Sequence, residues 1–216
     1  MYRYILFDLD GTLTDSREGI LHCVRETVLG YGDPVPPEET LLRFIGPPLQ
    51  DSFIRFCGYG AEKAAEAVER FRLIYEPVGQ YENRAAPGME AVMGRLRENG
   101  RVLALASSKP ENLCVSICER FGFTPHLTAL VGSPPHGDWE KEDVVREALR
   151  QLGVTDPSQA LMVGDRKFDV CGARACGVDC VGVEFFGYAP PGELREAGAV
   201  AVVKTPEELE EFILSH

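Results

Sequence analysis

The chain has 216 residues, 44% hydrophobic and 26% charged, which is enough for one full hydrophobic core and a smaller second lobe and excludes wholesale disorder. The formal net charge of −12 argues against a general nucleic-acid or anionic-membrane binder. No apolar run approaches transmembrane length, and Asp8 interrupts the first apolar segment too early for a signal peptide.

The first predicted element is a short strand that ends in two carboxylates. Ile5, Leu6 and Phe7 form an apolar run suited to a strand buried on both faces of a parallel sheet. Asp8 and Asp10 follow, and alternation along the strand places them on the same side of its C-terminal end. Ligands bind at that end in open α/β sheets, and two unpaired carboxylates there repel each other, so the pair predicts a cation site.

A helical insertion is predicted after this strand. One helix is expected to begin with Asp15 as its N-cap, and others are expected near residues 38–44, 49–56 and 61–75. No convincing strand is predicted between residues 14 and 80. We therefore expect an α/β core formed by residues 1–14 and 84–216, and an all-helical cap formed by residues 15–83.

From residue 88 onward, predicted strands and helices alternate. Strands are expected at 101–106, 127–131, 160–163, 178–183 and 200–203, and helices at 88–99, 111–121, 140–152, 168–176 and after Thr205. This alternation predicts a doubly wound, mostly parallel, Rossmann-like sheet with helices on both faces. Because the carboxyl ends of parallel strands meet at one edge, the residues that follow these strands are expected to lie together.

Two later strands also lead into polar residues. The second strand runs into Ser107 just ahead of a helix, where hydroxyls and unpaired backbone N–H groups suit an anion. The strand at 160–163 is followed by Asp165 and Asp169, and Lys141 opens the preceding helix. Four carboxylates at one crevice favour a hard, oxygen-liganded cation such as Mg²⁺, while the serine and the lysine complement a phosphoryl group.

These groups suit the hydrolysis of a phosphate monoester, a reaction so slow without catalysis that extensive charge neutralisation is expected. A carboxylate nucleophile splits this reaction into the formation and the hydrolysis of an acyl phosphate. A second carboxylate two residues away can protonate the leaving oxygen and then deprotonate the attacking water.

Four motifs follow one another along the chain. They are Asp8-Leu9-Asp10-Gly11-Thr12, Ser107, Lys141, and Gly164-Asp165 with Asp169. In these motifs the chain resembles the haloacid dehalogenase-like superfamily, in the phosphoglycolate-phosphatase-like branch with a helical cap inserted after the first strand. The resemblance covers essentially the whole chain and implies Mg²⁺ as the cofactor.

The resemblance also implies a role for each carboxylate. Asp8 would be the nucleophile that becomes phosphorylated, and it would also bind Mg²⁺. Asp10 would be the general acid/base and would bind the metal through its backbone carbonyl. Asp165 would bind Mg²⁺ directly, and Asp169 would hold a metal-bound water or position Lys141.

The remaining implied roles concern the phosphoryl group. Ser107 would hydrogen-bond its oxygens, and Lys141 would neutralise both the nucleophile and the transferring group. The backbone amides of Leu9, Asp10 and Ser108 would complete the phosphate cradle.

Some of these assignments have simpler alternatives. Ser107 could instead cap the following helix, and Asp169 could be a surface helix residue. Lys109 is the rival of Lys141, since it lies next to the predicted phosphate contact. Arg43 lies where related caps present a substrate-facing loop, so it is a candidate substrate contact, although exposed arginines are usually only solvated.

The leading hypothesis is an Mg²⁺-dependent phosphatase acting on small phosphate monoesters through an aspartyl-phosphate, with 2-phosphoglycolate and nucleoside monophosphates as candidate substrates. One alternative is a phosphomutase of the β-phosphoglucomutase type. Another is a phospho-receiver or phosphate-binding module without turnover, which is disfavoured because Asp8 and Asp10 share one strand and because receivers lack a cap. Dehalogenase chemistry is disfavoured because Asp10 supplies the second acid of phosphoryl transfer.

The expected partner is therefore a small phosphorylated metabolite, with no nucleic acid and no membrane. Seven cysteines without a C-x-x-C pair favour reduced, mostly buried thiols in a cytoplasmic protein. The sequence leaves open whether the protein is a monomer or a homodimer.

Overall fold

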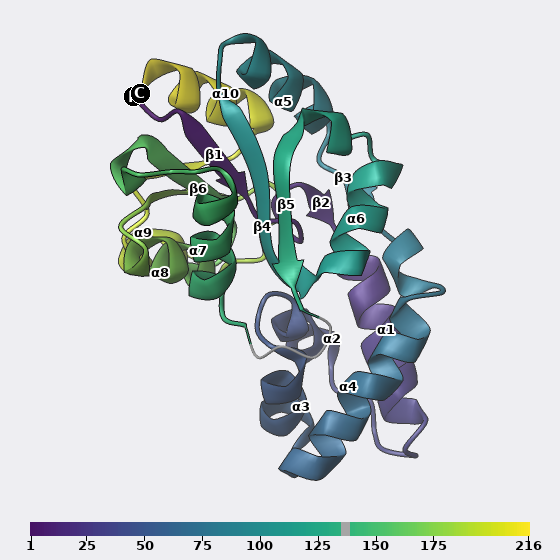
Figure 1. Cartoon of the computed structure of the whole chain (residues 1–216). Coiled ribbons are helices and arrows are strands. Elements are labelled where there is room, and N and C mark those ends of the chain that lie inside the picture. The colour runs from purple at the N-terminus through teal and green to yellow at the C-terminus, as the bar shows by residue number, and fades with distance from the viewer. Residues whose placement is uncertain (135–138) are drawn as a thin grey trace. The chain divides into compact units, whose positions relative to one another are not determined.

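The chain folds into an α/β unit, Met1–Thr14 with Ala85–His216, and a helical unit, Asp15–Arg84. These units are seen in a computed structural model, which describes residues 1–134 and 139–216 (Figure 1). The sequence predicted boundaries after residues 14 and 83, and the units divide after residues 14 and 84.

The α/β unit is built on a six-stranded sheet with the order β5-β4-β1-β6-β7-β8. Its strands are β1 (Tyr4–Phe7), β4 (Val102–Pro110), β5 (Leu127–Ser133), β6 (Ala160–Gly164), β7 (Asp179–Val183) and β8 (Ala201–Val203). The described neighbours pair in parallel, which confirms the predicted doubly wound architecture. Phe7 lies between Leu105 of β4 and Val163 of β6, so the ends of these three strands meet at one edge.

Helices cover both faces of this sheet (Figure 1). They are α5 (Met89–Glu98), α6 (Glu111–Arg120), α7 (Lys141–Gln151), α8 (Lys167–Ala175), α9 (Glu193–Ala197) and α10 (Pro206–Ser215). Ile5 and Phe7 are buried with residues of α5, α6 and α10, while Leu6 is buried with residues of α7, α8 and α9. This division follows from the alternation of side chains along β1.

The helical unit contains α1 (Arg17–Leu29), α2 (Glu38–Leu41), α3 (Leu49–Cys57) and α4 (Ala61–Tyr75). The aromatic residues Phe44, Phe53, Phe71 and Tyr75 are buried and supply much of its own core. At the two places where the chain passes between the units, β2 (Thr14–Asp15) pairs with β3 (Arg84–Ala85).

Several local predictions were wrong. Ser16, not Asp15, is the N-cap of α1, although the Asp15 carboxylate accepts a hydrogen bond from the Arg17 N–H at 3.2 Å. The helix expected at 38–44 is a short α-helix followed by a 3₁₀ turn at Leu42–Phe44. The sequence also missed α9, β3 and the strand at residues 14–15, because elements of two to five residues are too short to show a periodicity.

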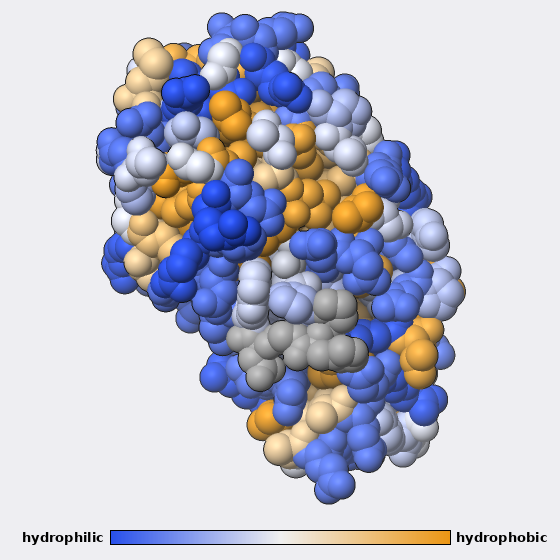
Figure 2. Space-filling view, in the orientation of Figure 1, coloured by the Kyte–Doolittle hydropathy of each residue, from blue (hydrophilic) through white to orange (hydrophobic). Residues whose placement is uncertain are grey.

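The surface is mainly hydrophilic in the view of Figure 2, with apolar side chains gathered over β4 and β5 of the α/β unit. In the described part of the chain, no helix combines the length and the apolar composition needed to cross a membrane. The seven cysteines are free in this structure, and four of them, Cys23, Cys114, Cys118 and Cys180, are buried, which agrees with the prediction of mostly buried thiols.

Candidate active site

The turn after β1 fixes the first site residues at the edge of the sheet. The Asp8 N–H donates to the Val163 carbonyl at 2.9 Å, which continues the pairing of β1 with β6 by one residue. The Leu9 carbonyl then accepts hydrogen bonds from the N–H groups of residues 12–14 at 2.9–3.3 Å. The chain therefore reverses tightly, and Asp8 stands at the carboxyl end of a central strand.

Two motif glycines allow the carboxylates to approach this turn. A Cβ on Gly11 would lie 2.2 Å from an Asp165 carboxylate oxygen, and the φ of 85° at Gly11 also requires glycine. A Cβ on Gly164 would lie 2.3 Å from the Asp169 side chain. A side chain at either glycine would therefore prevent Asp165 or Asp169 from taking its place beside the turn.

Three of the predicted carboxylates form a cluster. One carboxylate oxygen each from Asp8, Asp165 and Asp169 lies within 4.8 Å of the others. Asp165 is 3% exposed, and neither of its carboxylate oxygens has a hydrogen-bond partner within residues 1–134 and 139–216. A buried carboxylate left in this way is costly, so the geometry calls for a cation.

The burial of these carboxylates and their closeness to one another also shift their pKa values. Burial raises the pKa of Asp165 well above its usual range, and the neighbouring Asp169 and Asp8 add to the rise. Burial also raises the pKa of Asp8 to about 6, against the lowering influence of Lys141. Such perturbation of buried carboxylates is typical of functional sites.

Lys141 contacts two members of the cluster. Its Nζ lies 2.7 Å from Asp8 Oδ1 and 2.7 Å from Asp169 Oδ1, and it donates to the Ala106 carbonyl at 3.2 Å. Burial alone lowers the pKa of Lys141, but the two carboxylates raise it overall, so the side chain stays cationic. A Cβ on Gly172 of α8 would lie 2.7 Å from Lys141 Cγ, so the absence of a side chain there makes room for the lysine stem.

Lys109, weighed from the sequence only as the rival of Lys141, contacts a different carboxylate. Its Nζ donates to Asp10 Oδ2 at 2.8 Å, and its side chain is only 8% exposed. Asp10 Oδ1 is buried without a partner among the described residues. Each predicted catalytic aspartate on β1 and its turn therefore has its own lysine, and Lys141 is the one that touches Asp8.

Ser107 lies on β4, which continues to Pro110 rather than ending at the predicted residue 106. It is 3% exposed, and its Oγ accepts a long hydrogen bond, 3.4 Å, from the Lys109 N–H. Pro110 is the N-cap of α6, and no side chain in the described part of the chain caps that helix, so the capping alternative for Ser107 is wrong. The neighbouring Ser108 accepts a hydrogen bond at its carbonyl from Ser133 Oγ, 2.9 Å away.

Arg43 belongs to the helical unit. Its side chain is exposed in the 3₁₀ turn Leu42–Phe44, and its guanidinium carbon lies 4.4 Å from the centre of the Phe56 ring. Its role as a substrate contact stays a prediction.

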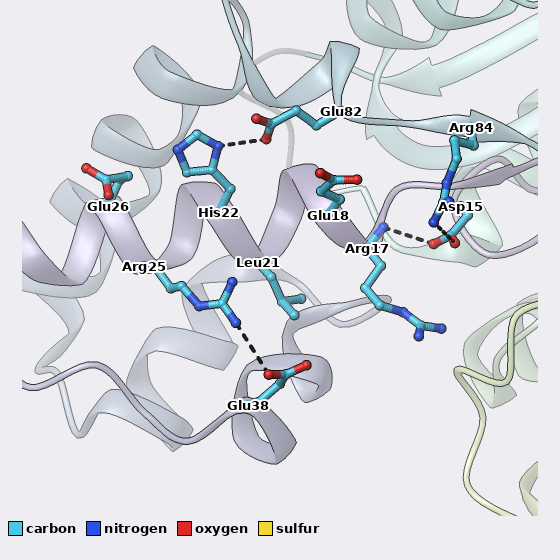
Figure 3. A pocket seen from close by; sticks show the side chains of 10 residues that line it. All are labelled: Asp15, Arg17, Glu18, Leu21, His22, Arg25, Glu26, Glu38, Glu82 and Arg84. Atoms are coloured by element: carbon cyan, nitrogen blue, oxygen red, sulfur yellow. Dashed lines mark hydrogen bonds and ion pairs between the residues drawn. The ribbon is translucent and has the colours of Figure 1, made fainter.

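The helical unit also holds a pocket of about 450 Å³, and none of the predicted site residues lines it (Figure 3). The ion pairs along its wall are His22–Glu82 at 2.7 Å, Arg25–Glu38 at 3.8 Å and Arg84–Asp15 at 3.3 Å. Most of the charged side chains that line this pocket thus form ion pairs with one another.

The chain is also similar to known proteins. The sequence model described as "Haloacid dehalogenase-like hydrolase" matches residues 5–183. A 5'-nucleotidase of Pseudomonas aeruginosa is 39% identical over 195 residues, which cover 90% of this chain and 87% of that protein. The tyrosine-protein kinase PtkA of Mycobacterium tuberculosis is 36% identical, covering 97% of this chain and 72% of that one.

Two further proteins are similar to this chain. A plasmid-encoded phosphoglycolate phosphatase of Cupriavidus necator is 32% identical, covering 95% of this chain and 90% of that protein. The crystal structure of a predicted phosphatase from Clostridium acetobutylicum superposes with a TM-score of 0.94 at 37% identity, over the full length of both chains.

Proposed function

The chain belongs to the haloacid dehalogenase-like hydrolase family, and we propose that it hydrolyses small phosphate monoesters with Mg²⁺ through a phosphorylated Asp8. It is a phosphatase of that family, like the relatives named 5'-nucleotidase and phosphoglycolate phosphatase and the structural neighbour named a predicted phosphatase. The metal, the covalent step and the substrate are the parts that we propose.

The observation that carries the proposal is the buried cluster of Asp8, Asp165 and Asp169 with Lys141. Its donor atoms are all carboxylate oxygens, which suits a hard cation such as Mg²⁺ better than zinc. The oxygens of Asp165 have no hydrogen-bond partner among residues 1–134 and 139–216. They fit a metal ligand, because a divalent cation would remove the penalty of leaving them buried. We propose that these aspartates, with the backbone carbonyl of Asp10, hold the ion.

Asp8 is suited to act as the nucleophile. Its Oδ1 is held by Lys141, which fixes the carboxylate and leaves Oδ2 to attack the phosphorus. In this first step a bond forms between Asp8 and phosphorus, the bond from phosphorus to the leaving oxygen breaks, and Asp10 donates its proton to that oxygen. When bound, Mg²⁺ would neutralise charge on the phosphoryl oxygens.

The second step returns the enzyme to its starting state. Asp10, now a carboxylate, takes a proton from water as the water oxygen attacks the phosphorus. The bond from phosphorus to Asp8 breaks, which frees inorganic phosphate and the Asp8 carboxylate. Lys141 would balance the charge of Asp8 in both steps, and Ser107 with the backbone of Leu9 and Ser108 would hold the phosphoryl oxygens.

We propose two substrate classes for the first tests, nucleoside 5'-monophosphates and 2-phosphoglycolate. The relative named 5'-nucleotidase supports the first class, and the relative named phosphoglycolate phosphatase supports the second. In both, the partner is a small phosphorylated metabolite, and Arg43 would contact the part of it that is not transferred.

Phosphoryl transfer to an acceptor other than water is the second candidate. It would use the same Asp8 chemistry, and the relative named tyrosine-protein kinase favours testing a tyrosyl acceptor. A phosphomutase would also transfer the phosphoryl group to an acceptor other than water, in this case a sugar phosphate. Release of inorganic phosphate in proportion to substrate consumed would dismiss both.

The proposal is tested with p-nitrophenyl phosphate and Mg²⁺, comparing the wild type with Asp8→Asn and with Glu38→Gln, a carboxylate-to-amide control in the helical unit. We expect Asp8→Asn to lower kcat on the order of 10³-fold or more, while Glu38→Gln stays within about twofold of the wild type. Chelation of Mg²⁺ should abolish wild-type turnover. Activity that survives Asp8→Asn would overturn the mechanism, and inactivity on every phosphoester would favour a phosphate-binding module.

A further inference from the structure

The end of β4 contains an irregular stretch that carries Lys109. Ala106 pairs with Val131 of β5 and Pro110 pairs with Ser133, so the register shifts between these two pairs. Between them β4 has residues 107–109, whereas β5 has only one residue. Irregularities of this kind are frequent beside active sites, where they re-aim a side chain. This stretch lies on the strand next to β1, which leads into Asp8 and Asp10.

The backbone of this stretch is held by contacts with β5 and α6. Ser133 Oγ donates to the Ser108 carbonyl at 2.9 Å, and Cys114 Sγ of α6 donates to the Lys109 carbonyl at 3.5 Å. A Cβ on Gly132 would lie 2.8 Å from the Lys109 carbonyl oxygen, so the lack of a side chain there lets β5 approach closely. The point from which the Lys109 side chain extends is therefore well defined.

The ammonium group of Lys109 binds one of the two oxygens of Asp10. Nζ donates to Oδ2 at 2.8 Å, and the two side chains are only 8% and 19% exposed. Within residues 1–134 and 139–216, no other side chain hydrogen-bonds this carboxylate, and its Oδ1 is buried without a partner. A charge-assisted hydrogen bond that is shielded from solvent fixes the orientation of a carboxylate. The two oxygens of Asp10 are therefore not equivalent.

We propose that Lys109 is a positioning residue for Asp10: it holds Oδ2 and thereby makes Oδ1 the atom that exchanges a proton with the reactants. The inference rests on the proposed function, in which Asp10 is first the acid and then the base. In the first step the proton on Oδ1 passes to the leaving oxygen, which keeps the electron pair of its breaking bond to phosphorus. In the second step Oδ1 takes a proton from the attacking water. Lys109 keeps its own protons in both steps and acts only through Asp10.

The effect of losing this contact depends on the leaving group. An alkoxide must be protonated as it leaves, whereas p-nitrophenolate is stable enough to leave without a proton. Without Lys109, the Asp10 carboxyl group loses its hydrogen-bond partner among the described residues and turns away from the leaving oxygen. Only substrates that need the proton then react more slowly. Benzyl phosphate and p-nitrophenyl phosphate provide this comparison, since both carry an aromatic ring.

The test measures kcat/KM for both substrates with Mg²⁺, because this ratio covers only the steps up to release of the leaving group. We expect Lys109→Met to lower kcat/KM about 100-fold for benzyl phosphate and less than about threefold for p-nitrophenyl phosphate. Asp10→Asn should show the same selectivity, and adding Lys109→Met to it should change neither value by more than about twofold. Lys63→Met is the matched control, since it removes the ion pair with Asp33 in the helical unit, and it should leave both values within about twofold of the wild type.

The outcomes separate this inference from the proposed function. Equal losses on both substrates in Lys109→Met, or a further loss when it is added to Asp10→Asn, would overturn the positioning role alone. Asp10→Asn without a selective loss on benzyl phosphate would overturn the acid/base role of Asp10 as well. Thermal unfolding shows whether each variant folds. If Lys109→Met does not fold, Lys109→Gln carries the same expectation, because its shorter, uncharged side chain also loses the contact, and equal losses on both substrates would again overturn the inference.

Discussion

The two charged regions of the chain differ in how their carboxylates are satisfied. In the pocket of the helical unit, Glu82 pairs with His22 and Glu38 pairs with Arg25, and all four side chains are partly or largely exposed. In the α/β unit, Asp165 is buried next to other carboxylates, and its oxygens have no hydrogen-bond partner in the part of the chain that the structure describes. Paired and solvated charges make modest contributions to stability, whereas a buried carboxylate without a partner is costly.

This difference shows why the pocket of the helical unit is not the better candidate for chemistry. A protein keeps an unpaired buried charge at the expense of its own stability only where a ligand completes the site. Loss of a carboxylate at the acidic edge of the α/β sheet should therefore raise the stability of the metal-free protein. Loss of a paired carboxylate in the helical unit should lower it.

The largest contrast is expected between Asp165→Asn and Asp33→Asn. Asp165→Asn should lower kcat on the order of 10³-fold and abolish stabilisation by Mg²⁺. It should nevertheless stabilise the metal-free protein by about 1–3 kcal/mol, because it removes a buried carboxylate that has no partner among the described residues. Asp33 instead accepts hydrogen bonds from Tyr59 and Lys63, so Asp33→Asn should lower the Tm. Thermal unfolding in EDTA measures the metal-free stability of each variant, and unfolding with Mg²⁺ measures its stabilisation by the metal. A metal-free Tm of Asp165→Asn below that of the wild type would contradict this contrast between the two units.

A smaller effect is expected from Gly172→Ala. The new methyl group would lie 2.7 Å from Lys141 Cγ and would push the lysine away from Asp8, so kcat should fall by about 10–100-fold with a smaller change in KM. The control is Gly60→Ala in the helical unit, where a Cβ meets no described atom within 4 Å. Equal kcat values for the two variants would show that the position of Lys141 does not depend on this contact.

The pH dependence of metal-free stability should also differ between the units. The folded-state pKa of Asp8, about 6, lies above its ordinary value of 3.8, so ionisation of Asp8 destabilises the fold as the pH rises from about 4 through 6. The pKa of Asp33 is lowered, chiefly by its hydrogen bond from Lys63, so its contribution is lost as the pH falls. In EDTA, the Tm of Asp8→Asn should exceed that of the wild type by a few degrees near pH 7 and by less near pH 4. A difference that does not change with pH would contradict this account of Asp8.

The smallest effect is expected from Arg43→Ala. Since Arg43 is exposed and stacks on Phe56, its loss should change the ratio of kcat/KM between nucleoside monophosphates and 2-phosphoglycolate about 3–10-fold. Turnover of p-nitrophenyl phosphate should stay the same. Equal losses on all three substrates would argue against a role in specificity.

The sequence predicted the sheet and the carboxylate edge because both follow from local patterns. The apolar run before Asp8 and the βα alternation specify a parallel sheet, and parallel strands bring their carboxyl ends to one edge. That topology was enough to predict that Asp165 and Asp169, more than 150 residues after Asp8, belong beside it.

The contacts that tune the site were not predictable in this way. The bond of Lys109 to Asp10, the space that Gly172 leaves for Lys141, and the close approach of Gly132 to Lys109 all depend on tertiary packing. In the sequence Lys109 is simply a second lysine near a serine, and Gly132 follows the strand predicted at 127–131 without any pattern that shows which backbone it approaches.

The central claim is that Asp8 becomes phosphorylated during turnover. The direct measurement is to quench the wild type during turnover of the substrate with Mg²⁺, reduce the protein with borohydride, and locate the modified residue by mass spectrometry. Because borohydride reduces an aspartyl-phosphate to homoserine, we expect homoserine at position 8, dependent on both substrate and Mg²⁺. Homoserine at another aspartate, or phosphate release on the enzyme with Asp8 never modified, would contradict the account.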